Sequence, residues 1–272
     1  MIIGNKVFDT QNNVYIVGIL NVTPDSFSDG GQYNALDDAL MKAQEMICQG
    51  IDIIDVGGES TRPGHTKVSS EQEINRVAPV IEKLKENFDI TISLDSYKWQ
   101  VVQALSNKID MINDIWGLQY DDMMAQVVAK SGLAYCLMHN RRSNLYKNFS
   151  EEYLSDINDS LEKSEKAGIE KGKIILDGGV GFAKDYNQNL HVINNTDRLC
   201  SLGYPVMIAT SRKSVIGLTL EKPTDQRLYG TLATTAVGVM KGASFVRVHD
   251  IEQNLDTIKM VKSIIKEDKW IK

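Results

Sequence analysis

The sequence has few cysteines, no excess of positive charge and no long hydrophobic run. Its 272 residues include only three cysteines, Cys48, Cys136 and Cys200, and no two of them form a CxxC pair. An odd number of scattered thiols is typical of a reducing compartment rather than of a disulfide framework. The chain has 30 Lys and Arg against 36 Asp and Glu, a net charge of -6. This balance repels a polyphosphate backbone and argues against a nucleic-acid partner.

Targeting and membrane signals are missing as well. The sequence contains no apolar run of about 18 residues, the length that a membrane-spanning helix needs. Lys6 and Asp9 stand near the amino terminus, where a signal peptide requires an uninterrupted apolar segment. We therefore expect a cytoplasmic protein without a membrane partner.

Eight short runs rich in β-branched residues recur along the chain. None of them alternates cleanly between polar and apolar residues, so each is predicted to be a strand buried on both faces, as in a parallel sheet. The predicted strands are residues 14–20, 51–56, 90–94, 109–112, 133–138, 174–176, 205–209 and 244–248.

Amphipathic helical patterns lie between these runs, and Ser70 with Glu73 fits a capping box at the start of one of them. Eight strand–helix repeats without a Pro- or Ser-rich linker favour an α/β fold, a single (β/α)8 TIM barrel over residues 14–272, rather than an open doubly wound sheet. Residues 1–13, with a turn at Asn12–Asn13, are predicted to form an N-terminal β-hairpin that plugs the barrel. The whole chain, 1–272, is expected to be one domain.

Polar residues follow nearly every predicted strand. In such barrels the reacting groups project from the carboxyl ends of the strands. Helix capping or turn formation explains one such residue, but a whole ring of them is better explained by a binding site. Arg247 lies inside the last strand, and the ring comprises Asn21, Gly57-Gly58-Glu59, Asp95, Asn113-Asp114, His139-Asn140, Asp177, Ser211-Arg212-Lys213 and His249-Asp250.

The ring combines two kinds of chemistry. Asp95, Asn113 and Asp177 suit a flat heterocycle that presents several N–H donors, because a carboxylate accepts two parallel hydrogen bonds. Arg247 and His249 are two residues apart on a strand, so they point to the same side and could hold a phosphate. An internal ion pair is the alternative explanation for these two residues.

Lys213 adds a cation opposite the acidic groups, unless it is a solvated surface lysine. No His and Cys cluster with metal-ligand spacing occurs, which argues against structural zinc; magnesium stays possible because it needs few protein ligands. The chain also lacks a G-x-S-x-G elbow, a Walker A loop and a G-x-G-x-x-G fingerprint. A serine nucleophile and dinucleotide binding therefore lose most of their support.

Two loops give the sequence its resemblance to a known family. Residues 21–31, NVTPDSFSDGG, and residues 57–64, GGESTRPG, resemble the two signature loops of the dihydropteroate synthases. The similarity continues through residues 95, 111–114, 138–139, 177–182, 211–214 and 247–249, so it covers nearly the whole chain. The resemblance implies a TIM-barrel enzyme of folate synthesis. Such an enzyme joins 7,8-dihydropterin-6-ylmethyl diphosphate to 4-aminobenzoate and releases pyrophosphate, with Mg²⁺ as cofactor.

The resemblance also implies residue roles at the pterin and metal. Met138 would pack beneath the pterin, Phe182 would contribute to substrate binding, and Asn21 would ligate Mg²⁺. The residues implied to bind the pterin are Asp95, Asn113, Asp177 and Lys213.

Further roles concern the diphosphate, the second substrate and catalysis. Arg247 and His249, helped by Thr61, would hold the diphosphate. Asp29 would stabilise a cationic pterin in an SN1-like route, in which the C–O bond breaks before nitrogen attacks. The residues implied to border the 4-aminobenzoate site are Phe27, Thr61, Arg62, Pro63 and Ser214, and those implied to be catalytic are Asp29, Asp95, Lys213, Arg247 and His249.

The resemblance has one departure and leaves three alternatives. The family commonly has proline after the aspartate matched by Asp177, whereas this chain has Gly178, which would loosen the backbone there. Family members are usually homodimers packed through barrel helices. The alternatives are a methyltetrahydrofolate methyltransferase-like barrel, an aldolase with a Schiff base on Lys213, and a non-catalytic pterin-binding barrel.

Overall fold

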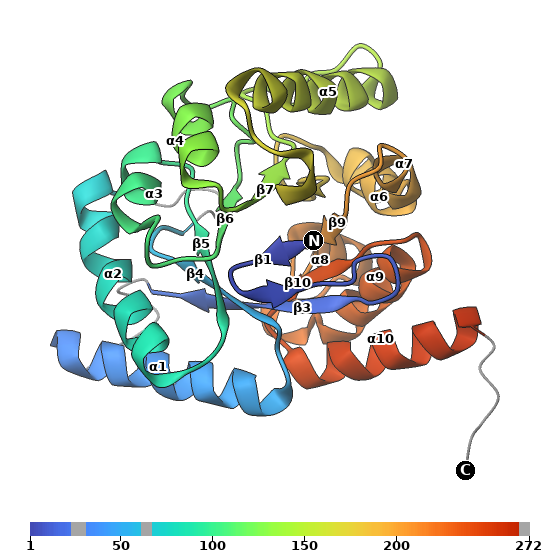
Figure 1. Ribbon diagram of the computed structural model, residues 1–272. Coiled ribbons are helices and arrows are strands. Elements are labelled where there is room, and N and C mark those ends of the chain that lie inside the picture. Colours follow the sequence, from blue (N-terminus) through green and yellow to red (C-terminus); the bar gives the residue numbers. More distant parts are fainter. Residues whose placement is uncertain (23–30, 61–66, 267–272) are drawn as a thin grey trace.

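The barrel closes as the strand runs predict. The computed structural model describes residues 1–22, 31–60 and 67–266 (Figure 1). Eight parallel strands form one closed barrel in the order β10-β3-β4-β5-β6-β7-β8-β9, and each lies within two residues of its predicted bounds. They are β3 Tyr15–Asn21, β4 Ile53–Gly57, β5 Thr91–Asp95, β6 Met111–Asp114, β7 Ala134–Met138, β8 Ile174–Asp177, β9 Val206–Ile208 and β10 Phe245–Val248.

Helices surround this ring of strands (Figure 1). Short 3-10 turns also occur at Lys171–Lys173 and Thr224–Gln226. In the described part of the chain, none of the helices is both long and apolar enough to cross a membrane. The helices are α1 Gly31–Gln49, α2 Ser70–Asn87, α3 Trp99–Leu105, α4 Met123–Ser131, α5 Phe149–Ala167, α6 Tyr186–Asn194, α7 Thr196–Cys200, α8 Ser214–Leu220, α9 Leu228–Met240 and α10 Ile251–Lys266.

The start of α2 differs from the prediction by one residue. Its capping box is formed by Ser69 and Gln72 instead of Ser70 and Glu73: Ser69 Oγ accepts from the Gln72 N–H at 3.1 Å, and Gln72 Oε1 accepts from the Ser69 N–H at 2.9 Å. Each of the two residue pairs contains a serine hydroxyl and, three residues later, a side-chain acceptor. Glu73 is buried in an ion pair with Lys98, which leaves the capping role to Gln72.

The N-terminal hairpin is present, but its turn is not where the sequence suggested. β1 (Ile2–Ile3) and β2 (Lys6–Val7) pair around Gly4 and Asn5. Gly4 has φ +59°, and a Cβ there would lie 2.6 Å from Asp110 Oδ1, so glycine suits this two-residue turn. Asn12–Asn13 instead belongs to a second turn, in which the Asn13 N–H donates to the Asp9 carbonyl at 2.9 Å.

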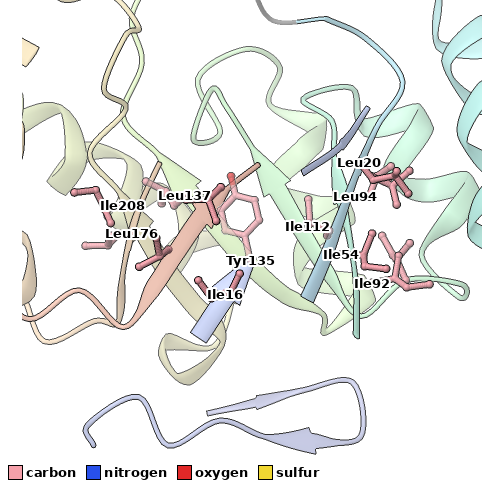
Figure 2. Packing of buried hydrophobic residues seen from close by; sticks show 14 of the residues in the cluster. Ile16, Leu20, Ile54, Ile92, Leu94, Ile112, Tyr135, Leu137, Leu176 and Ile208 are labelled. Atoms are coloured by element: carbon pink, nitrogen blue, oxygen red, sulfur yellow. The ribbon is translucent and has the colours of Figure 1, made fainter. Parts of the chain in front are cut away.

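Side chains of the barrel strands form two apolar layers. Those that point outward, such as Ile16, Leu94 and Leu176, pack beneath the helices (Figure 2). Those that point inward at the amino-terminal end form a separate cluster with Ile3 and Phe8. The hairpin therefore closes this end of the barrel, as predicted, and the opposite end is where a ligand can enter.

Candidate active site

The inward face of each strand changes from apolar to polar along its length. Successive inward side chains are two residues apart, so each step leads toward the carboxyl-terminal mouth. The lower members Ile53, Met111, Ile175 and Phe245 all belong to the apolar cluster that contacts the hairpin. Two residues further along the same strands stand Asp55, Asn113, Asp177 and Arg247. The strand alternation thus delivers a polar layer directly above the apolar one.

Arg247 is bound between two carboxylates. Its Nε donates to Asp55 Oδ2 at 2.6 Å and its Nη2 donates to Asp95 Oδ2 at 2.6 Å. Asn113 Nδ2 donates to the same Asp55 oxygen at 2.9 Å. Asp55 is completely buried. It contacts Asn113 and Arg247 directly, and Arg247 connects it with Asp95. We name Asp55, Asp95, Asn113 and Arg247 the acid–arginine cluster.

This cluster carries an unbalanced negative charge when both acids are ionised. Burial raises the pKa of Asp95 to about 7; the nearby charge of Asp55 adds to this effect, and Arg247 opposes it. Burial works against the charged form of Arg247, but the two carboxylates outweigh it and raise the pKa of the guanidinium. Arg247 therefore stays cationic, and the group of the cluster that titrates near neutral pH is Asp95.

Asp55 was not among the residues predicted for the site. It lies in the middle of an apolar strand run, and the pattern around it marks only a buried strand. A carboxylate in such a run is nevertheless a signal, because buried acids are rarely found without a partner. The internal ion pair considered for Arg247 is also present, so Arg247 already has two carboxylate partners in the described structure.

Asp177, the last residue of β8, and Lys213, directly before α8, lie at the same mouth. Asp177 is buried, and its Oδ1 accepts from the Gly179 N–H at 2.8 Å. Lys213 Nζ donates to the Val180 carbonyl at 2.5 Å and lies 4.9 Å from the centre of the Phe182 ring. Burial lowers the pKa of Lys213 to about 8 although Asp177 favours its charged form. Lys213 is therefore not a freely solvated surface lysine, because its ammonium lies against the Val180 carbonyl and the Phe182 ring.

The acidic and basic groups influence one another across the mouth. Burial raises the pKa of Asp177, while Lys213 and, more weakly, Arg247 act in the opposite direction. The charge of Asp95 likewise favours protonated Lys213. These effects connect Asp177 and Lys213 with the acid–arginine cluster, as a common mouth requires.

An apolar patch lies beside these polar groups. Met138 is buried in a small cluster with Tyr97 and Ile115, and the half-buried rings of Trp116 and Phe182 pack against it. The patch combines a flexible thioether with flat rings, which suits contact with an aromatic ligand. The structure thus brings Met138 and Phe182 together, as expected of two residues of one pocket.

His249 contacts Ser211 through its ring and its backbone. The Ser211 hydroxyl lies 2.9 Å from Nδ1 of His249, and its oxygen accepts from the His249 backbone N–H at 3.3 Å. The hydroxyl oxygen has a second lone pair, so the bond between Ser211 and Nδ1 can run in either direction. Burial, followed by the charge of Arg247, lowers the pKa of His249 to about 4. At neutral pH this residue is a neutral hydrogen-bond donor rather than a second cation.

Asn21 and Asp95 border the same small space. A Cβ on Gly57 would lie 3.6 Å from both Asn21 Oδ1 and Asp95 Oδ2. Both oxygen atoms therefore lie close to the space that a side chain at position 57 would fill. Among the described residues, no group of three or more His, Cys, Asp or Glu side chains could hold a metal ion, so any ion here would depend on a ligand for further oxygens.

The remaining predicted residues are placed less fully. Ser214 is the first residue of α8, directly after Lys213, and is exposed. The other predicted site residues lie outside the described part of the chain; these are Phe27, Asp29, Thr61, Arg62 and Pro63.

Part of the polar ring serves local structure. Asp114 accepts from the Trp116 and Leu118 N–H groups, each at 2.9 Å, and Asp250 pairs with Arg212. Turn formation and ion pairing are thus sufficient explanations for these ring members.

Lys98 forms a buried ionic cluster that the sequence did not reveal. Its Nζ donates to Glu59, to Glu73 Oε2 at 2.6 Å and to the Val68 carbonyl at 2.7 Å. Tyr97 also donates to Glu59, at 3.0 Å. Lys98 thus connects the end of β4 with the start of α2. Its partners are 25 to 39 residues away in the chain, so no local pattern could identify them.

Gly178 has no room for a side chain. A Cβ at this position would lie 2.5 Å from Val192 Cγ1 and 2.7 Å from Tyr153 Oη. Gly178→Ala is therefore expected to destabilise the protein by about 1–3 kcal/mol through overpacking, measured by urea unfolding. Gly172→Ala is the matched control, because nothing lies within 4 Å of its added Cβ. Equal unfolding midpoints for both variants and the unmodified protein would show that Tyr153 and Val192 move aside without a loss of stability.

Comparison with known proteins gives consistent results. Residues 17–249 match the family described as pterin binding enzyme. A dihydropteroate synthase of Clostridium beijerinckii is 51% identical over 268 residues, which are 98% of this chain and 100% of the relative. A dihydropteroate synthase of Bacillus subtilis is 47% identical over 256 residues, 94% of this chain and 90% of the relative.

Solved structures agree with these sequences. The crystal structure of a dihydropteroate synthase from Clostridium difficile, obtained in the presence of pteroic acid, has a TM-score of 0.92 at 48% identity and covers 95% of this chain and 99% of its own. That of a Yersinia pestis dihydropteroate synthase with a sulfonamide drug complex has a TM-score of 0.90 at 36% identity, covering 98% and 99%.

Proposed function

Because this chain belongs to the dihydropteroate synthase family of pterin-binding enzymes, and thus to the transferases of folate biosynthesis, we propose that its barrel mouth performs the family reaction with the residues described above. In this reaction, 7,8-dihydropterin-6-ylmethyl diphosphate and 4-aminobenzoate give 7,8-dihydropteroate and pyrophosphate. The observation that carries the assignment of residues is the acid–arginine cluster beside Asp177 and Lys213.

The acidic side of the mouth suits the pterin ring. A pterin presents several N–H donors along one edge, and Asp95, Asn113 and Asp177 offer carboxylate and amide oxygens to receive them. Met138 and Phe182 offer the apolar surface for the ring face. The buried position of these groups strengthens each hydrogen bond to a charged acceptor, because water competes less there.

The basic side suits the diphosphate. Arg247 supplies a permanent positive charge, and His249 supplies the N–H group of a neutral imidazole. Asn21 offers an oxygen ligand of the kind that Mg²⁺ prefers, and Mg²⁺ needs few ligands from the protein. Asn21 would hold the ion together with diphosphate oxygens, and the ion would neutralise charge on the leaving group.

The proposed chemistry needs no protein nucleophile. The electron pair of the C–O bond leaves with the diphosphate, and Arg247 and His249 stabilise the charge that builds there. The positive charge left on the pterin methylene is stabilised by Asp95 and, by family resemblance, Asp29. The amine nitrogen of 4-aminobenzoate then forms the C–N bond and loses a proton. Phe27, Thr61, Arg62, Pro63 and Ser214 are proposed to border this second substrate.

Family membership argues against the alternative reactions. The pKa of Lys213, lowered to about 8 by burial, would suit a Schiff base, but the lysine amine donates to Val180 and faces Asp177. A corrinoid-dependent methyl transfer has no use for the diphosphate groups Arg247 and His249. A barrel that binds pterin without turnover is distinguished by assay.

The assay combines purified chain, Mg²⁺, pterin diphosphate and 4-aminobenzoate. We expect equal amounts of dihydropteroate and pyrophosphate, each dependent on both substrates. Borohydride treatment in the presence of substrate should leave Lys213 unmodified. Pterin binding without release of pyrophosphate would support the non-catalytic alternative, and a reduced adduct on Lys213 would support the aldolase.

We further propose that the protein is a cytoplasmic homodimer. Several apolar side chains remain exposed on α8, α9 and α10, including Tyr229 at 76% and Met240 at 63% exposure. Helix α9 contacts both α8 and α10, so these side chains lie on neighbouring elements. The set comprises Leu218, Leu220, Tyr229, Val237, Met240, Met260, Ile264 and Ile265. A second copy of the chain would cover this surface.

Substitution of Tyr229 tests the proposed interface. Tyr229→Lys is expected to shift the protein from dimer to monomer in sedimentation equilibrium, because an interface core does not accommodate an unpaired charge. Leu145→Lys, at a side chain 78% exposed outside these helices, should leave the dimer unchanged. A Tyr229→Lys protein that sediments as a dimer would place the interface elsewhere.

A further inference from the structure

The segment between β8 and α6, residues 178–184, has an unusual backbone. Gly179, Gly181 and Ala183 all have positive φ angles, +67°, +87° and +46°, and alanine is rarely found in this region. At Gly179 a Cβ would lie 1.9 Å from the His139 carbonyl oxygen. Such a conformation persists only where surrounding contacts hold it in place. The segment also supplies Phe182 to the apolar patch and the Val180 carbonyl to Lys213.

Lys184 holds this segment through two backbone carbonyls. Its Nζ donates to the Gly179 carbonyl at 2.9 Å and to the Phe182 carbonyl at 2.9 Å, and it lies 2.8 Å from Nδ1 of His139. A longer contact of 3.5 Å joins Nζ to the His139 carbonyl. The two contacts to Gly179 and Phe182 fix carbonyls of the segment.

Asp156 sets the tautomer of His139. Nε2 of His139 is 3.1 Å from Asp156 Oδ2, and a carboxylate only accepts, so the ring proton lies on Nε2 and Nδ1 accepts from Lys184. Burial lowers the pKa of Lys184 to about 7, and both the ammonium and the neutral amine have N–H groups for this bond. Burial lowers the pKa of His139 to about 4, in agreement with a neutral ring. Lys184 thus donates to His139 and His139 donates to Asp156, so the hydrogen bonds run from the segment through the residue after β7 to α5.

The chain of contacts continues to the proposed pterin site. Gly179 accepts from Lys184 through its carbonyl and donates to Asp177 Oδ1 through its N–H at 2.8 Å. Phe182, whose carbonyl also accepts from Lys184, places its ring near the Lys213 ammonium. One lysine outside the pocket is thus connected to both the acid and the ring that line it.

We propose that Lys184 is a positioning residue for the pterin substrate, and that His139 and Asp156 hold its ammonium in place. It presets Asp177 and Phe182 for the ring without touching the substrate. This inference rests on the proposed function, because it concerns the pterin pocket of the same mouth. It assigns a role to three residues for which ordinary packing is the competing explanation.

Lys184→Met tests the proposal by separating the two substrates. The variant keeps the length of the side chain but removes the donors, so KM for the pterin diphosphate is expected to rise roughly tenfold or more, as on loss of hydrogen bonds to a charged group. KM for 4-aminobenzoate should stay unchanged. Lys6→Met is the matched control, because Lys6 also donates to a backbone carbonyl, that of Asp89 at 2.7 Å, but belongs to the hairpin at the other end of the barrel. An unchanged pterin KM would overturn the proposal.

Substitutions of His139 test the direction of the chain. In His139→Asn the amide oxygen can replace Nδ1 as an acceptor, whereas His139→Leu leaves Lys184 without this partner. We expect His139→Asn to retain most of the pterin affinity and His139→Leu to lose it. Equal losses in both variants would show that His139 acts by packing and not through Lys184.

Hydrogen exchange separates this proposal from the proposed function. In the ligand-free protein, amides of residues 179–183 are expected to exchange faster in Lys184→Met than in the unmodified chain, with other segments unaffected. If the unmodified protein fails to bind pterin, the proposed function fails while this result can still stand. Unchanged exchange would overturn the positioning role even in an active enzyme.

Discussion

Arg247→Met is expected to destabilise the protein by about 3–5 kcal/mol, the cost of removing one partner from a buried ion pair. The substitution leaves Asp55, which is completely buried, and Asp95 facing each other without a positive charge. The free energy of unfolding in urea measures the effect. Arg141→Met is the matched control, because Arg141 also lies between two acids, Glu152 and Asp156, but is more exposed; we expect a loss below about 1 kcal/mol there.

The loss in Arg247→Met should depend on pH. In the unmodified protein, burial raises the pKa of Asp95 to about 7, above its value in the unfolded chain. The contribution of this carboxyl to stability is therefore full below the unfolded pKa of about 4 and is lost as the pH rises through 7. Removal of Arg247 takes away an interaction that favours the ionised acid, so the difference in stability between variant and unmodified protein should grow as the pH rises through about 7.

A second substitution identifies the source of the loss. Asp55→Asn in the Arg247→Met background removes one of the two unpaired charges and keeps an amide oxygen for Asn113. The double variant is expected to be more stable than Arg247→Met alone. A double variant of lower stability, or a loss that does not vary with pH, would contradict the account of two carboxylates held together by one guanidinium.

Asp177→Ala is expected to weaken pterin binding by about 1.5–3 kcal/mol, or roughly 10- to 150-fold, the range for hydrogen bonds to a charged group. Isothermal titration with a dihydropterin measures this directly. Alanine also removes the acceptor for the Gly179 N–H, so part of the effect could come from the segment that follows. Asp177→Asn separates the two causes, because its amide oxygen can still accept from Gly179.

The expected result for Asp177→Asn is a folded protein with weakened pterin binding. The loss follows because an amide has one oxygen for acceptance where a carboxylate has two, and its NH₂ group opposes the N–H donors of the ring. If Asp177→Asn binds pterin as tightly as the unmodified protein, the charge of Asp177 has no part in recognition.

Much of the barrel could be predicted because its signals are local. A β-branched run bounded by turn residues marks a strand wherever its neighbours lie, and all eight predicted strands are confirmed. Local signals were ambiguous at the start of α2, where two adjacent serines both fit a capping box and Ser69 forms it. The hairpin turn was misplaced for another reason. Ile3 pairs with Lys6, so the turn lies at Gly4–Asn5 and not at Asn12–Asn13.

In the candidate site, some residues could be predicted from the sequence and others could not. Asp95, Asn113 and Asp177 could be named because they end strands, and strand ends meet at one mouth. Asp55 lies within a strand, and the partners of Lys184 and Lys98 are provided by distant segments. Their function depends on which segments meet in space, and no pattern along the chain carries that information. The roles assigned to Phe27, Asp29, Thr61, Arg62 and Pro63 stay predictions.

A crystal structure of the protein with the pterin diphosphate tests the central claim most directly. We predict that the ring edge binds to Asp95, Asn113 and Asp177, with the diphosphate directed toward Arg247 and His249 at the same mouth. A ring bound elsewhere on the molecule, or a diphosphate that points away from Arg247, would contradict the account.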